Sequence, residues 1–393
     1  MEETKLTSAA LPLAKDHSVY ALVMGSREGM RRLLGSHTEK LEKNADEAAW
    51  AMRRELCCLI GDESAPVYAQ ADDCAAPKTF AGRAARLLML RFQAGLPGLT
   101  LLPCAEAEHN GAHLQEAVIA CAVQWRYDVG FLRWLLTENR FCSTLTDCTE
   151  WLIETQSPED MPIPETEGAV RYVPALAPYR QRRQWMLGGA GVLTAACGAL
   201  CGLESCGETM RDADIRALLG HVLTQEMLSC LDFEHTEGLR YAARVCAYLE
   251  NACGGEKWPE IGEYLVRRLT GCILPAIMTY EKRCGTLPNG LCFALSAVIM
   301  LYAGVRMGEE KVYILPGAQG DMPALEEERV LSAFAHMSCD MPPESLAYAV
   351  LSDREIWGSD LREIAGLEEK VTSQLRDMQI LGVREAMRAA GGQ

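Results

Sequence analysis

The stretch Val19-Tyr-Ala-Leu-Val-Met24, followed by Gly25-Ser-Arg-Glu-Gly29, decides the fold of the N-terminal part of the chain. Six consecutive apolar residues rich in β-formers that end at a glycine are typical of a buried strand followed by a turn. Apolar or aromatic side chains then recur at helical spacing, at Met30, Leu33, Leu34, His37 and Leu41. The pattern therefore predicts a strand, a tight turn and a helix, in that order.

Two further strands are expected at residues 56–60 and 99–102, each made of short apolar runs bounded by polar or proline-containing segments. Amphipathic segments at residues 84–92, 114–124 and 129–137 predict helices between and after them. Because strands that alternate with helices are joined by crossover connections, the pattern favours a small parallel sheet covered by helices.

Proline density marks the boundary of this part. Five prolines fall within residues 156–178, at Pro158, Pro162, Pro164, Pro174 and Pro178, which no helix can sustain. We therefore expect an α/β domain over residues 1–155, a proline-rich linker over 156–178 and a second domain over 179–393. A length of 393 residues agrees with two domains, since single cores stop growing at roughly 250 residues.

The second domain is predicted to be helical. Strand signals nearly vanish beyond residue 178, and amphipathic segments follow one another at residues 184–203, 211–230, 237–251, 261–283, 291–302, 325–338 and 367–387. The expected fold class is thus α/β plus all-α, a reduced parallel-sheet domain followed by a helical C-terminal domain.

Composition excludes several classes of function. Hydrophobic residues make up 49% of the chain and charged residues 23%, which excludes disorder. The net charge of −16 opposes binding to nucleic acid phosphates or to an anionic membrane. The 17 cysteines are scattered among apolar runs, and residues 1–15 lack the apolar core of a signal peptide, so we expect a cytoplasmic protein with reduced thiols.

No single motif in the sequence is sufficient to identify a reaction. The turn at residues 25–29 has the right place for a phosphate cradle, but Ser26, Arg27 and Glu28 stand where a dinucleotide fingerprint needs glycines, so a turn without ligand is favoured. The Gly188-Gly-Ala-Gly191 run lies inside an apolar helical pattern and indicates close helix packing. The cysteines at 197, 201 and 206 include no CxxC pair. His109 and His113 flank a turn close to Glu106 and Glu108, which favours a surface loop, so no metal is expected.

Several segments, read in order, nevertheless resemble one family, the tagaturonate reductases (altronate oxidoreductases) among the mannitol dehydrogenase-like, polyol-specific long-chain dehydrogenases. The resemblance lies in Leu99-Thr-Leu-Leu-Pro-Cys104 with Asn110-Gly111, Phe141-Cys-Ser-Thr-Leu-Thr-Asp147, Pro178-Tyr-Arg-Gln-Arg-Arg183, Thr286-Leu-Pro-Asn-Gly-Leu-Cys-Phe and Trp357-Gly-Ser-Asp-Leu361. It covers most of the chain from about residue 80 onward. It implies a Rossmann-like N-terminal domain that binds NAD, a helical C-terminal domain, and hydride transfer between a keto sugar acid and its alcohol.

The chain departs from the family pattern where the chemistry takes place. The family motif sets a lysine base five residues before an asparagine and eight before a histidine, and here those places hold Arg183, Gly188 and Gly191. Arginine stays protonated at neutral pH and cannot act as the base, and glycine has no side chain to orient the substrate oxygen. Asn110 is the further catalytic candidate that the resemblance supplies.

The cofactor half of the resemblance is also incomplete. The candidate NAD-binding residues are Gly25, Gly29 and Asp147, but Cys148 stands where the family has an arginine, and Glu256 where it has a histidine. Only about a dozen residues separate the expected first helix from the strand at residues 56–60, where the family has two further strands and the acid that binds the ribose. A reduced Rossmann-like sheet that has lost its adenosine side is therefore predicted.

Three interpretations stand at this point. The first is a catalytically degenerate member with a binding or regulatory role toward a sugar acid or a protein partner. The second is an active NAD-dependent oxidoreductase that takes its base from Glu106, Glu108 or His109. The third, a thiol-based redox or metal protein, rests on the cysteine count alone. In the first two, we expect a pocket formed by Asn110, Asp147, Arg183 and residues 188–191.

Overall fold

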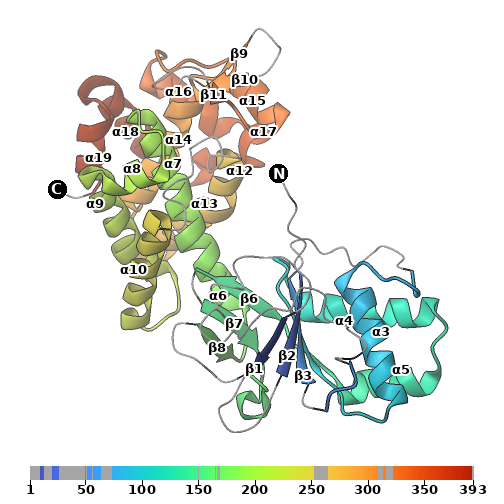
Figure 1. The fold of residues 1–393 in the computed structure, drawn as a ribbon. Helices are drawn as coiled ribbons and strands as arrows, with labels where there is room; N and C mark the ends of the chain where they lie inside the picture. The colour runs from blue at the N-terminus through green and yellow to red at the C-terminus, as the bar shows by residue number, and fades with distance from the viewer. Residues whose placement is uncertain are drawn as a thin grey trace. The chain divides into compact units, whose positions relative to one another are not determined.

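The computed structural model describes residues 9–12, 20–25, 49, 51–54, 56–62, 73–148, 150–163, 165, 169–251, 264–308, 313–315 and 322–391. The chain forms two compact units, Met1–Ala177 and Pro178–Gln393, called here the first and the second unit (Figure 1). The helix predicted after residue 29 lies outside the described residues. None of the described helices is both long and apolar enough to cross a membrane.

The first unit is built on a five-stranded sheet whose strands follow their order in the chain, β1-β2-β3-β4-β5. The strands are β1 (Ala9–Pro12), β2 (Tyr20–Gly25), β3 (Leu56–Asp62), β4 (Thr100–Pro103) and β5 (Arg140–Phe141). Strands β2 to β5 are parallel, which confirms the predicted parallel sheet, whereas β1 pairs antiparallel with β2. The antiparallel edge strand and the two-residue β5 were not predicted, because both are too short to show an alternating pattern.

Among the described residues of the first unit, three helices cover one face of this sheet: α3 (Phe80–Gln93), α4 (Asn110–Gln124) and α5 (Val129–Glu138). Alternate strand residues such as Leu59 and Leu101 point into the core that these helices share. Helix α3 begins where the Thr79 hydroxyl accepts from the Gly82 N–H, and α5 begins where the Asp128 carboxylate accepts from the Phe131 N–H. The helices predicted at residues 84–92, 114–124 and 129–137 are therefore present, with their apolar sides on the sheet.

A second, three-stranded sheet packs on the opposite face (Figure 1). It consists of β6 (Thr144–Asp147), β7 (Glu150–Glu154) and β8 (Val170–Val173), with β6 antiparallel and β8 parallel to β7. Trp151 and Ile153 of β7 pack against Cys58, Ile60 and Leu102 of the first sheet. This sheet was not predicted, and β8, together with the one-turn 3₁₀ helix η1 (Pro158–Asp160), lies in the segment 156–178 that was expected to be a linker.

The second unit is mainly helical, as predicted. Its α-helices are α6 (Ala177–Arg182), α7 (Gly189–Leu200), α8 (Cys206–Arg211), α9 (Ala213–His221), α10 (His235–Asn251), α12 (Leu265–Cys272), α13 (Leu274–Cys284), α14 (Asn289–Tyr302), α15 (Glu328–Phe334), α16 (Pro343–Ser352), α17 (Arg354–Trp357), α18 (Leu367–Leu381) and α19 (Val383–Ala390). Two π-helical stretches, η2 (Arg183–Gly188) and η3 (Val222–Met227), and two 3₁₀ turns, η4 (Leu228–Cys230) and η5 (Leu361–Glu363), continue or connect them.

Helix α14 forms the centre of this unit. It is buried almost all round and packs against α7, α12 and α18, as a helix that is apolar on every side must. The buried carboxylate of Glu226 in η3 accepts hydrogen bonds from the N–H groups of Gly290 and Leu291, both at 2.8 Å. It thereby satisfies the amino end of the helix, where a negative charge is favourable.

The expectation of an all-helical second domain is wrong in one detail. Three short strands, β9 (Arg306–Met307), β10 (Tyr313–Leu315) and β11 (Met322–Pro323), form a small antiparallel sheet in the order β11-β10-β9. Strands of two or three residues complete at most one period of alternation, so no pattern in the sequence could reveal them.

Candidate functional site

The three positions of the family motif lie on one helical stretch of the second unit. Arg183 begins the π-helical turn η2, Gly188 ends it, and Gly191 lies in the first turn of α7. A π-helical turn inserts an extra residue into a helix and is frequently found at functional sites. The sequence therefore located a real structural irregularity, although its periodicity could not show the π-helical geometry.

Arg182, the residue before this turn, is fixed in the interior. Its side chain is completely buried, and its guanidinium carbon lies 3.9 Å from the ring centre of Tyr241, 5.0 Å from that of Tyr179 and 4.9 Å from that of Phe233. One terminal nitrogen lies 3.1 Å from the carboxylate of Glu237. Cation–π contacts and the ion pair together hold the register of the helix, which sets the place of Arg183.

Helix α12 fills the space beside the two glycines. A β-carbon on Gly188 would lie 2.6 Å from the sulfur of Cys272, and one on Gly191 would lie 2.6 Å from Nη2 of Arg268. Arg268 and Cys272 are four residues apart and so point from the same side of their helix. The volume that the asparagine and histidine of the family motif would enter is occupied by a guanidinium group and a thiol.

The contact between η2 and α12 is tied by further interactions. The side-chain amide of Gln184 donates to the carbonyl oxygen of Gly271 at 2.9 Å. Burial raises the pKa of the Cys272 thiol to about 11, and the positive charge of Arg268 opposes that rise. The thiol is thus protonated at neutral pH and behaves as a packing group rather than a nucleophile.

Asn110, the remaining catalytic candidate, lies in the first unit as the first residue of α4 and is completely buried. Its amide nitrogen donates to the carbonyl oxygens of Ala105 at 2.8 Å, of Thr144 at 3.0 Å and of Pro103 at 3.3 Å. Its amide oxygen accepts from the Thr144 N–H at 2.9 Å. The side chain is engaged with the backbone on both its donor and acceptor sides, so it ties the end of β4 to the start of β6.

Gly111, the residue after Asn110, packs closely against the segment that precedes β6. A β-carbon on Gly111 would lie 2.6 Å from the backbone carbon of Cys142, so only glycine permits the approach of α4 to this segment. The Gly111 N–H donates to the hydroxyl of Ser143 at 3.2 Å. The Asn110-Gly111 pair is therefore a structural joint between β4, α4 and β6.

The candidate cofactor residues are spread over the first unit. Gly25 is the last residue of β2 and pairs with Asp62 of β3 at the carboxyl edge of the sheet. Asp147 ends β6 opposite Glu150, and both carboxylates are buried, at 1% and 6% exposure. Gly29, the rest of the 25–29 turn and Glu256 lie outside the described residues. Because Asn110 and Asp147 belong to one unit and Arg183, Gly188 and Gly191 to the other, the pocket expected among them stays a prediction.

The order of the strands in the first sheet can be compared with that of a Rossmann sheet that binds NAD. A Rossmann sheet binds its dinucleotide where the strand order reverses, beside the first strand of the βαβ unit. Here β2, the strand in that place, has parallel β3 on one side and antiparallel β1 on the other, and the described order runs without reversal. Among the described strands, the first sheet therefore has no point at which the strand order reverses.

The described cysteines and histidines form no metal site: no group of three or more His, Cys, Asp and Glu side chains within the described ranges could hold an ion. Burial raises the pKa of Cys58, Cys142, Cys197, Cys230 and Cys292, which makes these thiols inert. The groups that sequence reasoning missed are Arg268 and Cys272, whose four-residue spacing was the only signal available.

Comparisons agree with this architecture. The family model described as "Mannitol dehydrogenase C-terminal domain" matches residues 175–379. Altronate oxidoreductase of Yersinia pestis is 31% identical over 352 residues, which cover 80% of this chain and 71% of the relative. Altronate oxidoreductase of Pectobacterium carotovorum is 31% identical over 349 residues with the same coverage.

Two solved structures share the fold. D-Sorbitol dehydrogenase in substrate-free form has a TM-score of 0.66 at 14% identity, covering 97% of this chain and 83% of its own. Pseudomonas fluorescens mannitol 2-dehydrogenase, solved with NAD and D-mannitol, has a TM-score of 0.50 at 14% identity, covering 98% and 82%. The fold is thus the two-domain architecture of polyol dehydrogenases. The chain belongs to the mannitol dehydrogenase family, with altronate oxidoreductases among its relatives.

Proposed function

We propose that this chain is a sugar-acid-binding protein of the mannitol dehydrogenase family that has lost hydride transfer. Its relatives are altronate oxidoreductases, so the ligand class we propose is a hexonate or keto-hexuronate. Arg183 takes the place of the family's lysine, and the guanidinium of Arg268 lies beside the place of its histidine. Guanidinium groups bind carboxylates in a two-pronged geometry, which suits an anionic sugar acid.

The contact between Arg268 and Gly191 is the main observation that supports the proposal. A missing histidine alone would leave a gap, whereas here Nη2 of Arg268 lies 2.6 Å from the β-carbon position. Cys272 likewise fills the place beside Gly188. Neighbouring side chains thus fill the space that side chains at positions 188 and 191 would need. This packing supports a site whose function is not hydride transfer.

The chemistry of position 183 supports the same proposal. Oxidation of an alcohol by hydride transfer needs a base that accepts the hydroxyl proton, and the ideal pKa of such a base lies near the working pH. A guanidinium group keeps its proton at every pH that the protein meets. Loss of a general base costs a factor of about 10² to 10⁴, and loss of an oxygen-orienting donor costs about 10² to 10³.

The strand order argues against NAD as a cofactor of this chain. The mannitol 2-dehydrogenase structure contains NAD, and the family resemblance implies it. The absence of a reversal point beside β2 among the described strands does not fit that implication.

The second candidate function is an active NAD-dependent reductase whose base comes from Glu106, Glu108 or His109. All three side chains are exposed just before α4. This alternative supplies a base, but it leaves positions 188 and 191 and the strand order unexplained. We therefore rank it second.

The deciding experiment measures turnover and binding on the full chain. NADH oxidation at 340 nm is followed with tagaturonate and with fructuronate, with the Yersinia pestis altronate oxidoreductase as the positive control. We expect no turnover above background, and a saturable rise in melting temperature with altronate or tagaturonate but not with NAD or NADH. Turnover at an enzymatic rate would establish the second candidate, and the absence of any sugar-acid binding would overturn the proposed binding role.

A matched pair of variants locates the binding. Arg268→Met should weaken sugar-acid binding at least tenfold, because it removes the charge beside Gly191. Arg283→Met removes an arginine of α13 whose guanidinium pairs with Asp232 on the surface, 3.0 Å away, and should leave binding unchanged. Equal binding by both variants would contradict the placement of the ligand at Arg268.

A further inference from the structure

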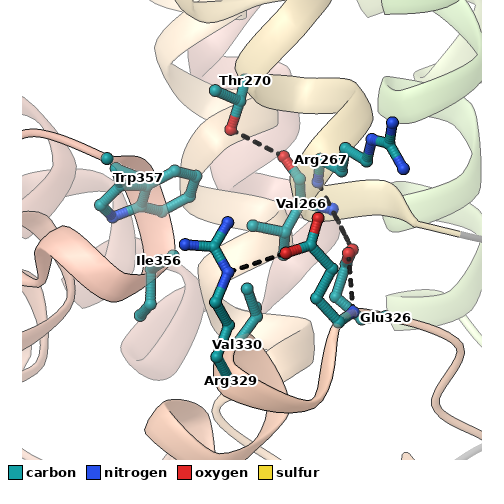
Figure 2. A pocket seen from close by; sticks show the side chains of 10 residues that line it. Val266, Arg267, Thr270, Glu326, Arg329, Val330, Ile356 and Trp357 are labelled. Atoms are coloured by element: carbon teal, nitrogen blue, oxygen red, sulfur yellow. Dashed lines mark hydrogen bonds and ion pairs between the residues drawn. The ribbon is translucent and has the colours of Figure 1, made fainter.

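A cavity of about 150 Å³ lies in the second unit between α12, α15 and α17, separate from the positions of the family motif. Figure 2 shows its lining, to which Thr270, Glu326, Glu327, Arg329, Val330 and Trp357 contribute. A cavity of this volume is about the size of one that holds benzene, so it accommodates a molecule of about six to eight non-hydrogen atoms.

Arg329 is a strong donor group in the lining of the cavity. Nε of Arg329, whose side chain is 53% exposed, donates to the carboxylate of Glu327 at 2.7 Å, and this ion pair orients the guanidinium. Figure 2 shows the Arg329 guanidinium beside Trp357. Its two terminal nitrogens make no hydrogen bond to the described residues around them, and they are available to oxygen atoms of a ligand.

The acceptors are equally well fixed. One oxygen of the Glu326 carboxylate accepts from the N–H groups of Val266 at 2.9 Å and Arg267 at 3.4 Å, and the other accepts from the Glu327 N–H at 3.2 Å. Burial raises the pKa of Glu326, and these backbone hydrogen bonds oppose the rise. The Thr270 hydroxyl donates to the Val266 carbonyl at 2.9 Å, so toward the cavity it acts as an acceptor.

One wall of the cavity is apolar and rigid. The Trp357 indole N–H donates to the Val350 carbonyl at 2.8 Å, and the side chain is only 5% exposed, so the ring cannot turn away. Val330, 3% exposed, lies on the same lining. Such apolar groups pack against the C–H groups of a ligand, while the polar groups of the lining bind its oxygens.

The charges of the lining select an uncharged ligand. An anion would face the carboxylates of Glu326 and Glu327, and a cation would face Arg329 and the neighbouring Arg267. A hydroxyl group both donates and accepts, so several adjacent hydroxyls match the carboxylate oxygens and guanidinium N–H groups of the lining. Their carbon chain matches its apolar groups, Trp357 and Val330.

We propose that this cavity binds a small, uncharged polyhydroxy compound of three or four carbons. The site is independent of the sugar-acid site proposed above, since none of its lining residues belongs to the family motif.

Saturation-transfer NMR on the full chain tests the proposal, with glycerol and erythritol as probes and acetate and ethylammonium as charged probes of similar size. We expect saturable transfer to glycerol or erythritol and weaker or no transfer to the charged probes. Val330→Phe should fill the cavity and lower the affinity at least tenfold. Arg329→Met should lower it severalfold, because the donors are lost.

Thr279→Val is the matched control. The Thr279 hydroxyl donates to the Pro275 carbonyl four residues earlier, as Thr270 does to Val266, but it lies on α13 outside the cavity. Thr270→Val should weaken polyol binding and Thr279→Val should not. This comparison tests the proposed site even if Val330→Phe fails to fold. The proposal is overturned if neither polyol binds, if a charged probe binds more tightly, or if the cavity variants bind as the control does.

Discussion

The sulfur of Cys272 lies 2.6 Å from the place that a β-carbon on Gly188 would take. Cys272 is 7% exposed and belongs to α12, whose backbone is tied to η2 by the bond from Gln184 to Gly271. The thiol therefore cannot withdraw easily. The two elements fit each other only while position 188 carries no side chain.

Gly188→Ala should destabilise the protein by about 1–3 kcal/mol, the usual cost of overpacking a well-packed core. The measurement is the free energy of unfolding in urea. Gly220→Ala is the control: Gly220 lies in α9, and a β-carbon there meets no atom within 4 Å. That substitution should stabilise the protein slightly, because alanine favours the helix over glycine.

Removal of the sulfur should relieve the clash. In the double variant Gly188→Ala/Cys272→Ala, the cost of the first substitution should fall by at least half relative to its cost in the native background. Independent, additive effects of the two substitutions would show that the contact between these residues is not the cause.

Arg183→Lys should not produce dehydrogenase activity. The substitution restores a group that can act as a base, but positions 188 and 191 still lack side chains and the space beside them stays filled by Cys272 and Arg268. NADH oxidation with tagaturonate should stay at the background rate. An enzymatic rate in this single variant would show that the base was the only missing part.

Asn110→Ala should lower the free energy of unfolding by about 2–4 kcal/mol, because each buried polar group left without a partner costs about 1–3 kcal/mol. The groups at stake are the Thr144 N–H and the carbonyl oxygens that Asn110 binds. Asn251→Ala is the control, since that side chain is exposed and binds only the Ala247 carbonyl. Equal stability of the two variants would contradict the structural role assigned to Asn110.

Stability should fall as the pH rises above about 9. Burial raises the pKa of Cys230 and of Cys272 from the usual 9.0 to about 11. Between these values the thiols ionise in the unfolded chain but stay protonated in the folded one, so the unfolded state binds fewer protons and gains stability. The stabilisation is complete below pH 9 and is lost as the pH rises through 11.

Urea unfolding under reducing conditions at pH 8, 9, 10 and 10.5 measures this effect. Each of the two thiols should contribute about 1 kcal/mol of lost stability per pH unit. Cys230→Ala or Cys272→Ala should flatten the dependence, whereas Cys339→Ala, which removes an exposed thiol, should not. An unchanged slope in both buried variants would refute the assignment.

The sequence was sufficient to predict the elements whose burial is one-sided or complete over several residues. Strands β2, β3 and β4 are visible as apolar runs, and the helices of the first unit as apolar residues at helical spacing. Strands β6, β7 and β8 were missed because Trp151 and Ile153 face a core whose other half comes from β3 and β4. Burial of that kind is a tertiary property with no local signal.

The candidate site likewise has a part that the sequence predicts and a part that depends on tertiary packing. The motif spacing located Arg183, Gly188 and Gly191, and the absence of side chains at the last two could be read directly. Arg268 and Cys272 fill the space beside Gly191 and Gly188 because α12 packs against η2 and α7. The two pairs of residues lie about 80 positions apart in the chain, so the local sequence around the motif does not reveal the contact. The catalytic role expected of Asn110 stays a prediction, and its amide forms hydrogen bonds with the backbone that the sequence did not reveal.

The order of the strands in the first unit sets a limit on how this protein can evolve. Side chains can be exchanged one at a time, and a lysine, an asparagine and a histidine are each a few nucleotide changes away. A crevice at a point of reversal, however, needs additional parallel strands on the side of β2 where β1 now pairs. That change requires an insertion of whole segments and the displacement of an existing strand. Under the proposed loss of hydride transfer, point substitutions would restore side chains at positions 183, 188 and 191 but would leave this order of the described strands unchanged.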